Sequence, residues 1–235
     1  MSDKHLSTQF DAELAGISNR VLEMGGMVEA QVSQAVYSLA NFSGETATQV
    51  LQQEERVNQM EVEIDRDLSA IIARRQPTAR DLRLLIAISK IIANLERVGD
   101  EAARIARTVQ RLINTGVSSR LRLPVADLGY EAELAIAQLR KALDAFARLD
   151  TAQALQVLKG DDQIDQEFDG LLRKLITYMM EDPRTISSSI DLVFVAKAIE
   201  RVGDHAKNLS EAVIYIVKGA DVRHTSMSDV EDAIR

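Results

Sequence analysis

Apolar residues recur at intervals of three and four along almost the whole chain, the spacing that places them on one face of an α-helix. From Leu85 one such stripe passes through Ile92 and Gly99 and reaches Val109. Turn-forming residues interrupt the pattern at residues 41–46, 75–81, 114–120, 148–151 and 181–189. The pattern therefore predicts six helices, followed by a polar tail after Gly219.

The chain also repeats itself. The motif ERVGD at residues 96–100 returns 104 positions later at residues 200–204, and the same offset aligns Gly25 with Gly129 and Phe42 with Phe146. Three helices in each copy predict an all-α fold of two tandem three-helix bundles related by an internal repeat. We expect residues 1–116 to form the first repeat, residues 117–218 the second, and residues 219–235 a polar C-terminal tail.

Composition narrows the classes of function. The formal net charge of -8 opposes nucleic-acid binding, and no basic patch offsets it. The absence of cysteine excludes disulfides and thiolate metal sites. The N-terminus lacks the apolar core of a signal peptide, and no apolar run reaches the roughly 18 residues of a membrane span, so we expect a cytoplasmic protein.

The glycine of ERVGD lies within the apolar stripe of its helix in both copies. A glycine costs a helix about 1 kcal/mol relative to alanine, so its presence at matching places needs a reason. The missing side chain would let a neighbouring helix come close at Gly99 and Gly203.

The acids that flank these glycines form a pattern. Glu96 and Asp100 are four residues apart and share one flank of their helix. Antiparallel helices bring like flanks together, and acids on the preceding helix lie at the mirrored distance from the connecting turn. We therefore expect four carboxylates to gather in each repeat, namely Glu61, Asp65, Glu96 and Asp100 in the first, and Asp165, Asp169, Glu200 and Asp204 in the second.

Such a cluster is costly unless a positive charge lies within it, because like charges repel and raise one another's pKa. A hard cation such as Mg²⁺, Mn²⁺, Ca²⁺ or iron suits an all-oxygen site. The alternative is ordinary ion pairing with nearby cations, for which Arg66, Arg97, Lys174 and Arg201 are available. His205 follows Asp204 directly and is either a surface residue or a further ligand, while Glu101 takes its place in the first repeat.

No catalytic pattern accompanies the acids. The sequence contains no nucleophile paired with a base, no glycine-rich phosphate loop and no zinc motif, and neither Glu96 nor Glu200 is followed by the histidine of a di-iron site. We therefore do not expect an enzyme.

The two copies of ERVGD, preceded by PTARDLRLLIAISKIIANL in one repeat and DPRTISSSIDLVFVAKAI in the other, resemble the PhoU family. The opening HLSTQFDAEL and the stretch MGGMVEAQ extend the resemblance over residues 5–218. It implies paired three-helix bundles, a homodimer, and metal clusters at E/D-x-x-x-D motifs, which match the eight acids named above. One departure is Arg104, which stands where the motif carries an asparagine, kept here as Asn208.

The resemblance also implies a role. Members of the family help keep phosphate-starvation genes off when phosphate is plentiful. They do so by linking a phosphate ABC transporter, through its PstB-like ATPase, to a PhoR-like sensor histidine kinase. The chain would then be a regulatory adaptor that binds no nucleic acid and reaches the membrane only through its partners. The alternative is a metal-dependent enzyme or metal buffer that uses the same carboxylate clusters.

Overall fold

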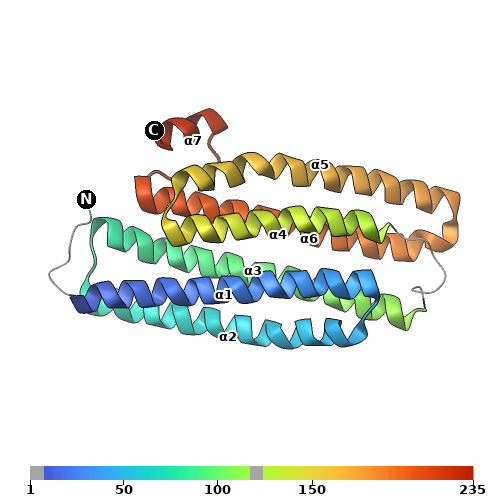
Figure 1. The fold of residues 1–235 in the computed structure, drawn as a ribbon, viewed down its shortest axis with the longest axis horizontal. Helices are drawn as coiled ribbons and strands as arrows, with labels where there is room; N and C mark the ends of the chain where they lie inside the picture. Colours follow the sequence, from blue (N-terminus) through green and yellow to red (C-terminus); the bar gives the residue numbers. More distant parts are fainter. Residues whose placement is uncertain (1–7, 117–123, 235) are drawn as a thin grey trace.

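The computed structural model describes residues 8–116 and 124–234, which form seven α-helices and one 3₁₀ turn and contain no β-strand (Figure 1). This confirms the predicted all-α class and the six long helices. Their bounds are α1 Thr8–Asn41, α2 Gly44–Arg75, α3 Ala79–Asn114, α4 Val125–Arg148, α5 Thr151–Glu181, α6 Ile186–Lys218 and α7 Met227–Ile234, with the 3₁₀ turn η2 at Pro183–Thr185.

Helices α1 to α3 form one bundle and helices α4 to α6 form the other, and the two bundles lie side by side (Figure 1). Helices α3 and α6 pack against each other in opposite directions, and α1 also contacts α4. Arg111 near the end of α3 consequently pairs with Asp191 near the start of α6, at 3.1 Å. The apolar side chains of both repeats therefore share one continuous core.

Helices α1 to α5 end within the turn segments that the sequence predicts, and local capping residues mark several of these boundaries. Ser43 precedes α2 and its hydroxyl accepts a hydrogen bond from the Thr46 amide, while Asp150 accepts from the amides of Ala152 and Gln153 before α5. Gln76 ends α2 in the left-handed conformation, with φ 48°. The predicted turn at residues 114–120 lies mostly outside the described residues.

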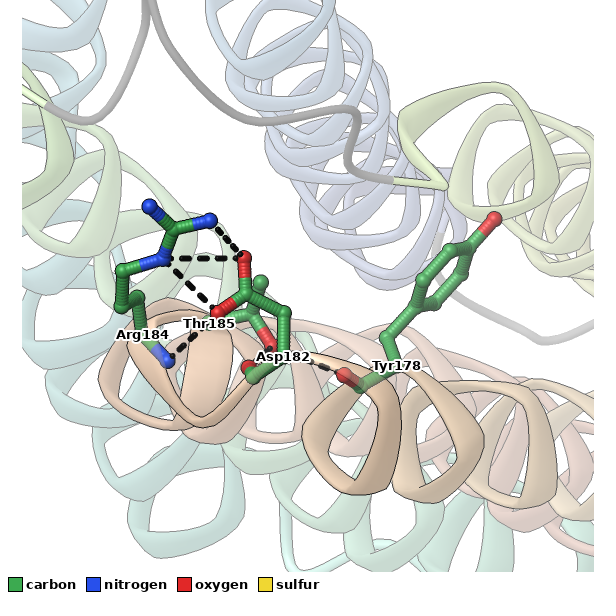
Figure 2. A network of polar contacts seen from close by, with 4 residues as sticks. All are labelled: Tyr178, Asp182, Arg184 and Thr185. Carbon is green, nitrogen blue, oxygen red and sulfur yellow. Dashed lines mark hydrogen bonds and ion pairs between the residues drawn. The ribbon is translucent and has the colours of Figure 1, made fainter.

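The turn between α5 and α6 is held by one polar network (Figure 2). The Asp182 carboxylate accepts hydrogen bonds from the backbone amide and the guanidinium of Arg184, at 2.8 to 3.2 Å. The Thr185 hydroxyl donates to the backbone carbonyls of Tyr178 and Asp182. Arg184 lowers the pKa of Asp182, so the carboxylate keeps its charge and the turn is fixed in mildly acidic solution.

The two ERVGD glycines are sites of close helix packing, as expected. A Cβ at Gly203 would lie 2.8 Å from Ile164 Cδ1 on α5, and a Cβ at Gly99 would lie 3.2 Å from Gln31 Oε1 on α1. Both distances are shorter than ordinary contacts, so each glycine sets how near its neighbour can come.

The segment treated in the sequence analysis as a polar tail contains a packed helix. Gly219 ends α6 with φ 74°, and α7 then contacts α5 and α6. Val222 and Val230 are buried, and Lys159 on α5 pairs with Glu231 at 2.5 Å. Met227, Val230 and Ile234 recur at steps of three and four, so the helical spacing is present in the sequence but extends over only about two turns.

Within the described part of the chain, no helix combines the length and the apolar character needed to cross a membrane.

Candidate metal centre

The first acidic cluster lies on the flank that α2 and α3 share. Glu61 on α2 and Glu96 and Asp100 on α3 act electrostatically on one another, as the sequence predicts. Glu54, two turns before Glu61 on α2, joins them through a contact with Asp100. These four carboxyls form the first cluster as the structure has it.

Burial and mutual repulsion make these acids harder to ionise. Burial is the main cause that raises the pKa of Glu54, Glu61 and Glu96, and the neighbouring carboxylates add to it. Arg107 opposes the rise at Glu54, with which it makes hydrogen bonds of 2.8 and 3.0 Å. Arg97 opposes it at Glu61 and Glu96, but Arg97 itself makes no hydrogen bond or ion pair to a described residue. The first cluster thus has less positive charge than carboxylate charge around it.

Asp65, the fourth acid predicted for this cluster, lies at its edge. Its Oδ1 accepts a hydrogen bond from Ser89 Oγ at 3.5 Å, two turns before Glu96 on α3, although its charge still acts on Glu61. The loop between the helices spans residues 76–78. Asp65 contacts Ser89, seven residues before Glu96 on α3, and Glu54 rather than Asp65 lies beside Asp100.

In the second cluster, too, an acid nearer the start of the first helix of the hairpin takes the place of the last predicted member. Asp165, Glu200 and Asp204 act on one another, and Asp161, one turn before Asp165, completes the group. Burial is the main cause that raises the pKa of Asp165 and Asp204, and the charge of Asp161 comes next for both. The predicted member Asp169 instead points outward, with its nearest cation Arg173 at 3.9 Å on the same helix.

Two lysines lie within the second cluster. Lys197 Nζ donates to Glu200 Oε1 at 2.6 Å, and Lys207 Nζ donates to Asp161 Oδ2 at 2.5 Å. The first repeat has Ala93 and Ala103 at the matching positions. Ion pairing, the alternative to a bound cation, therefore operates in the second repeat, but through lysines that the sequence analysis did not single out.

The cations proposed from sequence behave differently from one another. Lys174 pairs with Asp127 at 2.6 Å and Arg66 lies 3.7 Å from Asp67, so both are engaged outside the clusters. Arg201 pairs with Glu101 at 3.1 Å across the contact between α3 and α6. Of these four cations, Arg97 is the one whose charge acts on the predicted acids, namely on Glu61 and Glu96.

Beneath the second cluster, α4 contributes a buried acid. Glu131 is 1% exposed, and neither of its carboxylate oxygens has a hydrogen-bond partner among the described residues. Burial, followed by the charges of Glu200 and Glu167, raises its pKa to about 8. The Oε2 atom of Glu200 is likewise buried without a partner.

His205 lies at the contact between the repeats. Its Nδ1 is 2.9 Å from Asn94 Oδ1 on α3, an oxygen that also accepts from Asn208 Nδ2 at 3.0 Å. The His205 ring therefore donates from Nδ1 and is neutral, because burial and the charges of Arg97 and Arg201 lower its pKa to about 4. His205 thus joins α6 to α3, a role that its place beside Asp204 in the sequence does not indicate.

A groove of about 1110 Å³ runs along the contact between α3 and α6, with residues 221–230 of the C-terminal segment as one wall. Asp100 and Asp204 both line it, so an acid of each cluster faces the same hollow. Arg97, Arg201 and His205 also line it.

The residues fit a hard cation in chemistry more than in their present geometry. Every potential ligand atom of the predicted acids is a carboxylate oxygen, and three buried oxygens of Glu131 and Glu200 accept no hydrogen bond from the described residues. Across residues 8–116 and 124–234, however, no three aspartate, glutamate or histidine side chains are grouped so that they could hold a metal ion as they stand. In the second cluster a bound cation would have to compete with Lys197 for Glu200 and with Lys207 for Asp161.

Three of these acids were missed by sequence reasoning, and each left a signal. Glu54 is seven residues before Glu61 and so lies on the same face of α2. Asp161 repeats the four-residue spacing that joins Asp165 to Asp169. Glu131 is a charge inside the apolar stripe formed by Leu128, Ala132 and Ala135.

Comparison with known proteins gives the same duplication. The model of a protein family described as PhoU domain matches twice, at residues 21–109 and 131–213. These two segments fall within the two repeats read from the sequence.

Individual proteins are similar over nearly their full length. A protein of a Burkholderia species named phosphate-specific transport system accessory protein PhoU homolog is 50% identical over 226 residues, covering 96% of both chains. The crystal structure of PhoU from Pseudomonas aeruginosa superposes with a TM-score of 0.83 at 44% identity, covering 90% of this chain and all of that one. The phosphate transport system regulatory protein PhoU from Streptococcus pneumoniae gives a TM-score of 0.83 at 28% identity, covering 91% and 99%.

Proposed function

The chain belongs to the PhoU family, and from this premise we propose that it is a regulatory adaptor of phosphate homeostasis. In this role it is an accessory protein of phosphate-specific transport that holds the phosphate-starvation response off when phosphate is plentiful. The observation that carries the proposal is the duplicated PhoU domain in a chain that matches its relatives over 90% or more of its length. Those relatives are named as accessory or regulatory proteins and not as enzymes, in agreement with the expected absence of catalysis.

The proposed partners are the ATPase of a phosphate ABC transporter and a sensor histidine kinase, with the chain acting in the cytoplasm as a homodimer. The two bundles share one core and therefore form a rigid body. This supports the role, because a rigid body can present the same surface to each of two partners. The groove along α3 and α6 offers a concave, charged surface that a partner can contact.

Metal binding is the second part of the proposal. The clusters around Glu96 and Asp100, and around Glu200 and Asp204, would bind Mg²⁺, Mn²⁺, Ca²⁺ or iron through carboxylate oxygens. Support comes from the raised pKa of five of these acids, Glu54, Glu61, Glu96, Asp165 and Asp204. A bound cation would relieve the repulsion that raises them. The cation would neutralise the charge of the carboxylates and so hold the two helices of each hairpin together along this flank.

The test is complementation of a strain that lacks its own phosphate regulator, with a reporter of phosphate-starvation genes as readout. Wild type should repress the reporter in high phosphate, and a Glu96→Ala, Asp100→Ala, Glu200→Ala, Asp204→Ala variant should not. Asp169→Ala is the matched control, because this acid lies outside the cluster. Pull-downs from membranes prepared in high and low phosphate should recover transporter ATPase and kinase with wild type.

Failure of wild type to repress, with no partner recovered at either phosphate level, would refute the adaptor role. If the quadruple variant lost bound metal but repressed normally, the clusters would not be the regulatory element.

A further inference from the structure

The second repeat contains a buried acid that the internal repeat does not duplicate. Glu131 on α4 is 1% exposed, whereas the matching position in the first repeat is Met27, which packs against the core. A buried carboxyl without a hydrogen-bond partner destabilises a fold, so packing alone favours the residue found in the first repeat. The acid at this position therefore requires another explanation.

Glu131 faces the second acidic cluster from below. The acids that act on it are Glu200 on α6 and Glu167 on α5. Glu200 has one oxygen bound to Lys197 and the other, Oε2, buried without a partner. Helices α4 and α6 thus bury three carboxylate oxygens that accept no hydrogen bond from any described residue.

Buried acceptors of like charge are stabilised either by donors or by a cation. The cationic side chains nearest the second cluster, Lys197 and Lys207, are each bound to an acid other than Glu131. Arg201, the remaining cation of ERVGD, pairs with Glu101 on the far side of α6, against α3. Among the described residues, no side chain therefore supplies a positive charge that would balance the Glu131 carboxylate.

We infer that Glu131 is an inner ligand of a hard divalent cation in the second cluster, where it binds the ion together with Glu200. The inference rests on the proposed function, in which the clusters bind metal. It adds a ligand from a third helix, α4, and it makes the second site different from the first, where Met27 offers no oxygen. The cation would tie α4 to the hairpin of α5 and α6.

The test uses Mn²⁺ and the full chain carrying Glu96→Ala and Asp100→Ala, so that only the second cluster keeps the two acids of its ERVGD motif. Mn²⁺ binding is measured by calorimetry and by electron paramagnetic resonance in this parent, in Glu131→Gln and in Glu131→Met. Glu133→Gln, which changes an exposed acid on the same helix, is the matched control. Thermal melting with and without Mn²⁺ provides a second readout.

Both Glu131 variants should raise the Kd for Mn²⁺ at least tenfold, while Glu133→Gln binds like the parent. The variants should melt higher than the parent without metal, yet gain less from added Mn²⁺, a combination that a purely structural role would not produce. In the reciprocal background with Glu200→Ala and Asp204→Ala, Glu131→Gln should leave Mn²⁺ binding to the first cluster unchanged.

Equal Mn²⁺ affinity in the parent and both Glu131 variants would overturn the inference and leave metal binding by the clusters intact. No Mn²⁺ binding by wild type itself would overturn both the inference and the metal-binding part of the proposed function.

Discussion

Replacing Glu131 by methionine, the residue at the matching place in the first repeat, should stabilise the metal-free protein. The folded state raises the pKa of Glu131 to about 8, against 4.5 for an ordinary glutamate. The unfolded chain therefore loses its proton at lower pH than the folded chain. Below pH 4.5, where Glu131 is protonated in both states, the acid costs no folding free energy. The cost appears as the pH rises from 4.5 towards 8, because the unfolded chain then loses the proton more readily than the folded chain.

The size of the effect follows from these two values. Each pH unit between them costs about 1.4 kcal/mol of unfolding free energy, so at pH 7 the acid costs about 3 kcal/mol relative to a side chain that does not ionise. For a chain of this length, that difference corresponds to a rise in melting temperature of roughly 6 to 12 °C.

The assay is urea unfolding of wild type and Glu131→Met at intervals from pH 5 to 8, with a chelator present throughout. All other acids are common to both proteins, so the difference between them isolates Glu131. The difference should grow with pH and reach about 3 kcal/mol at pH 7. Glu133→Met, at an exposed position on the same helix, should stay within about 0.5 kcal/mol of wild type.

A stability difference that does not change between pH 5 and 8 would refute the argument, because Glu131 would then have the same pKa in both states. A less stable Glu131→Met at pH 7 would show that the carboxyl has a favourable partner in solution.

Three further outcomes are expected. Glu54→Gln should weaken Mn²⁺ binding at the first cluster at least tenfold, as measured by calorimetry. Asp65→Asn should have a smaller effect, because Asp65 lies towards Ser89, and equal effects would contradict the register described here. Arg201→Ala should lower the unfolding free energy by about 1 to 3 kcal/mol in urea, because Glu101 is buried and loses a bond of 3.1 Å, whereas Arg173→Ala at an exposed pair should change it by less than about 0.5 kcal/mol. Asp150→Ala should cost about 1 kcal/mol in thermal unfolding, since two amides at the start of α5 lose their acceptor, and an unchanged melting temperature would show that water replaces it fully.

Much of the fold could be read from the chain because it depends on local patterns. The three- and four-residue spacing gave the six long helices, and Ser43, Asp150 and the residues around Pro77 and Pro183 marked their ends. The two glycines of ERVGD predicted close helix contacts, which Gln31 and Ile164 make. The helix α7 was not predicted, although Met227, Val230 and Ile234 have helical spacing, because this stripe spans only eight residues.

The candidate site was predicted in part. Glu61, Glu96 and Asp100 come together as expected, and so do Asp165, Glu200 and Asp204. The two acids of each ERVGD motif share a helix face because they are four residues apart on one helix. Their partners across the hairpin depend on how far one helix slides along the other. That distance is fixed by the left-handed Gln76 and the short loop after it, and by the Asp182 turn, whose geometry no periodicity reveals.

The sequence by itself therefore determined the helices, the duplication, the family and the flank on which the acids lie. Only the tertiary structure decided that Glu54 and Asp161 replace Asp65 and Asp169 beside ERVGD, that Lys197 and Lys207 enter the second cluster, and that Glu131 is buried beneath it. The physical reason is that helix formation and face sharing depend on residues a few positions apart. Burial, charge pairing and the packing of α3 against α6 depend on residues that meet only once the chain has folded.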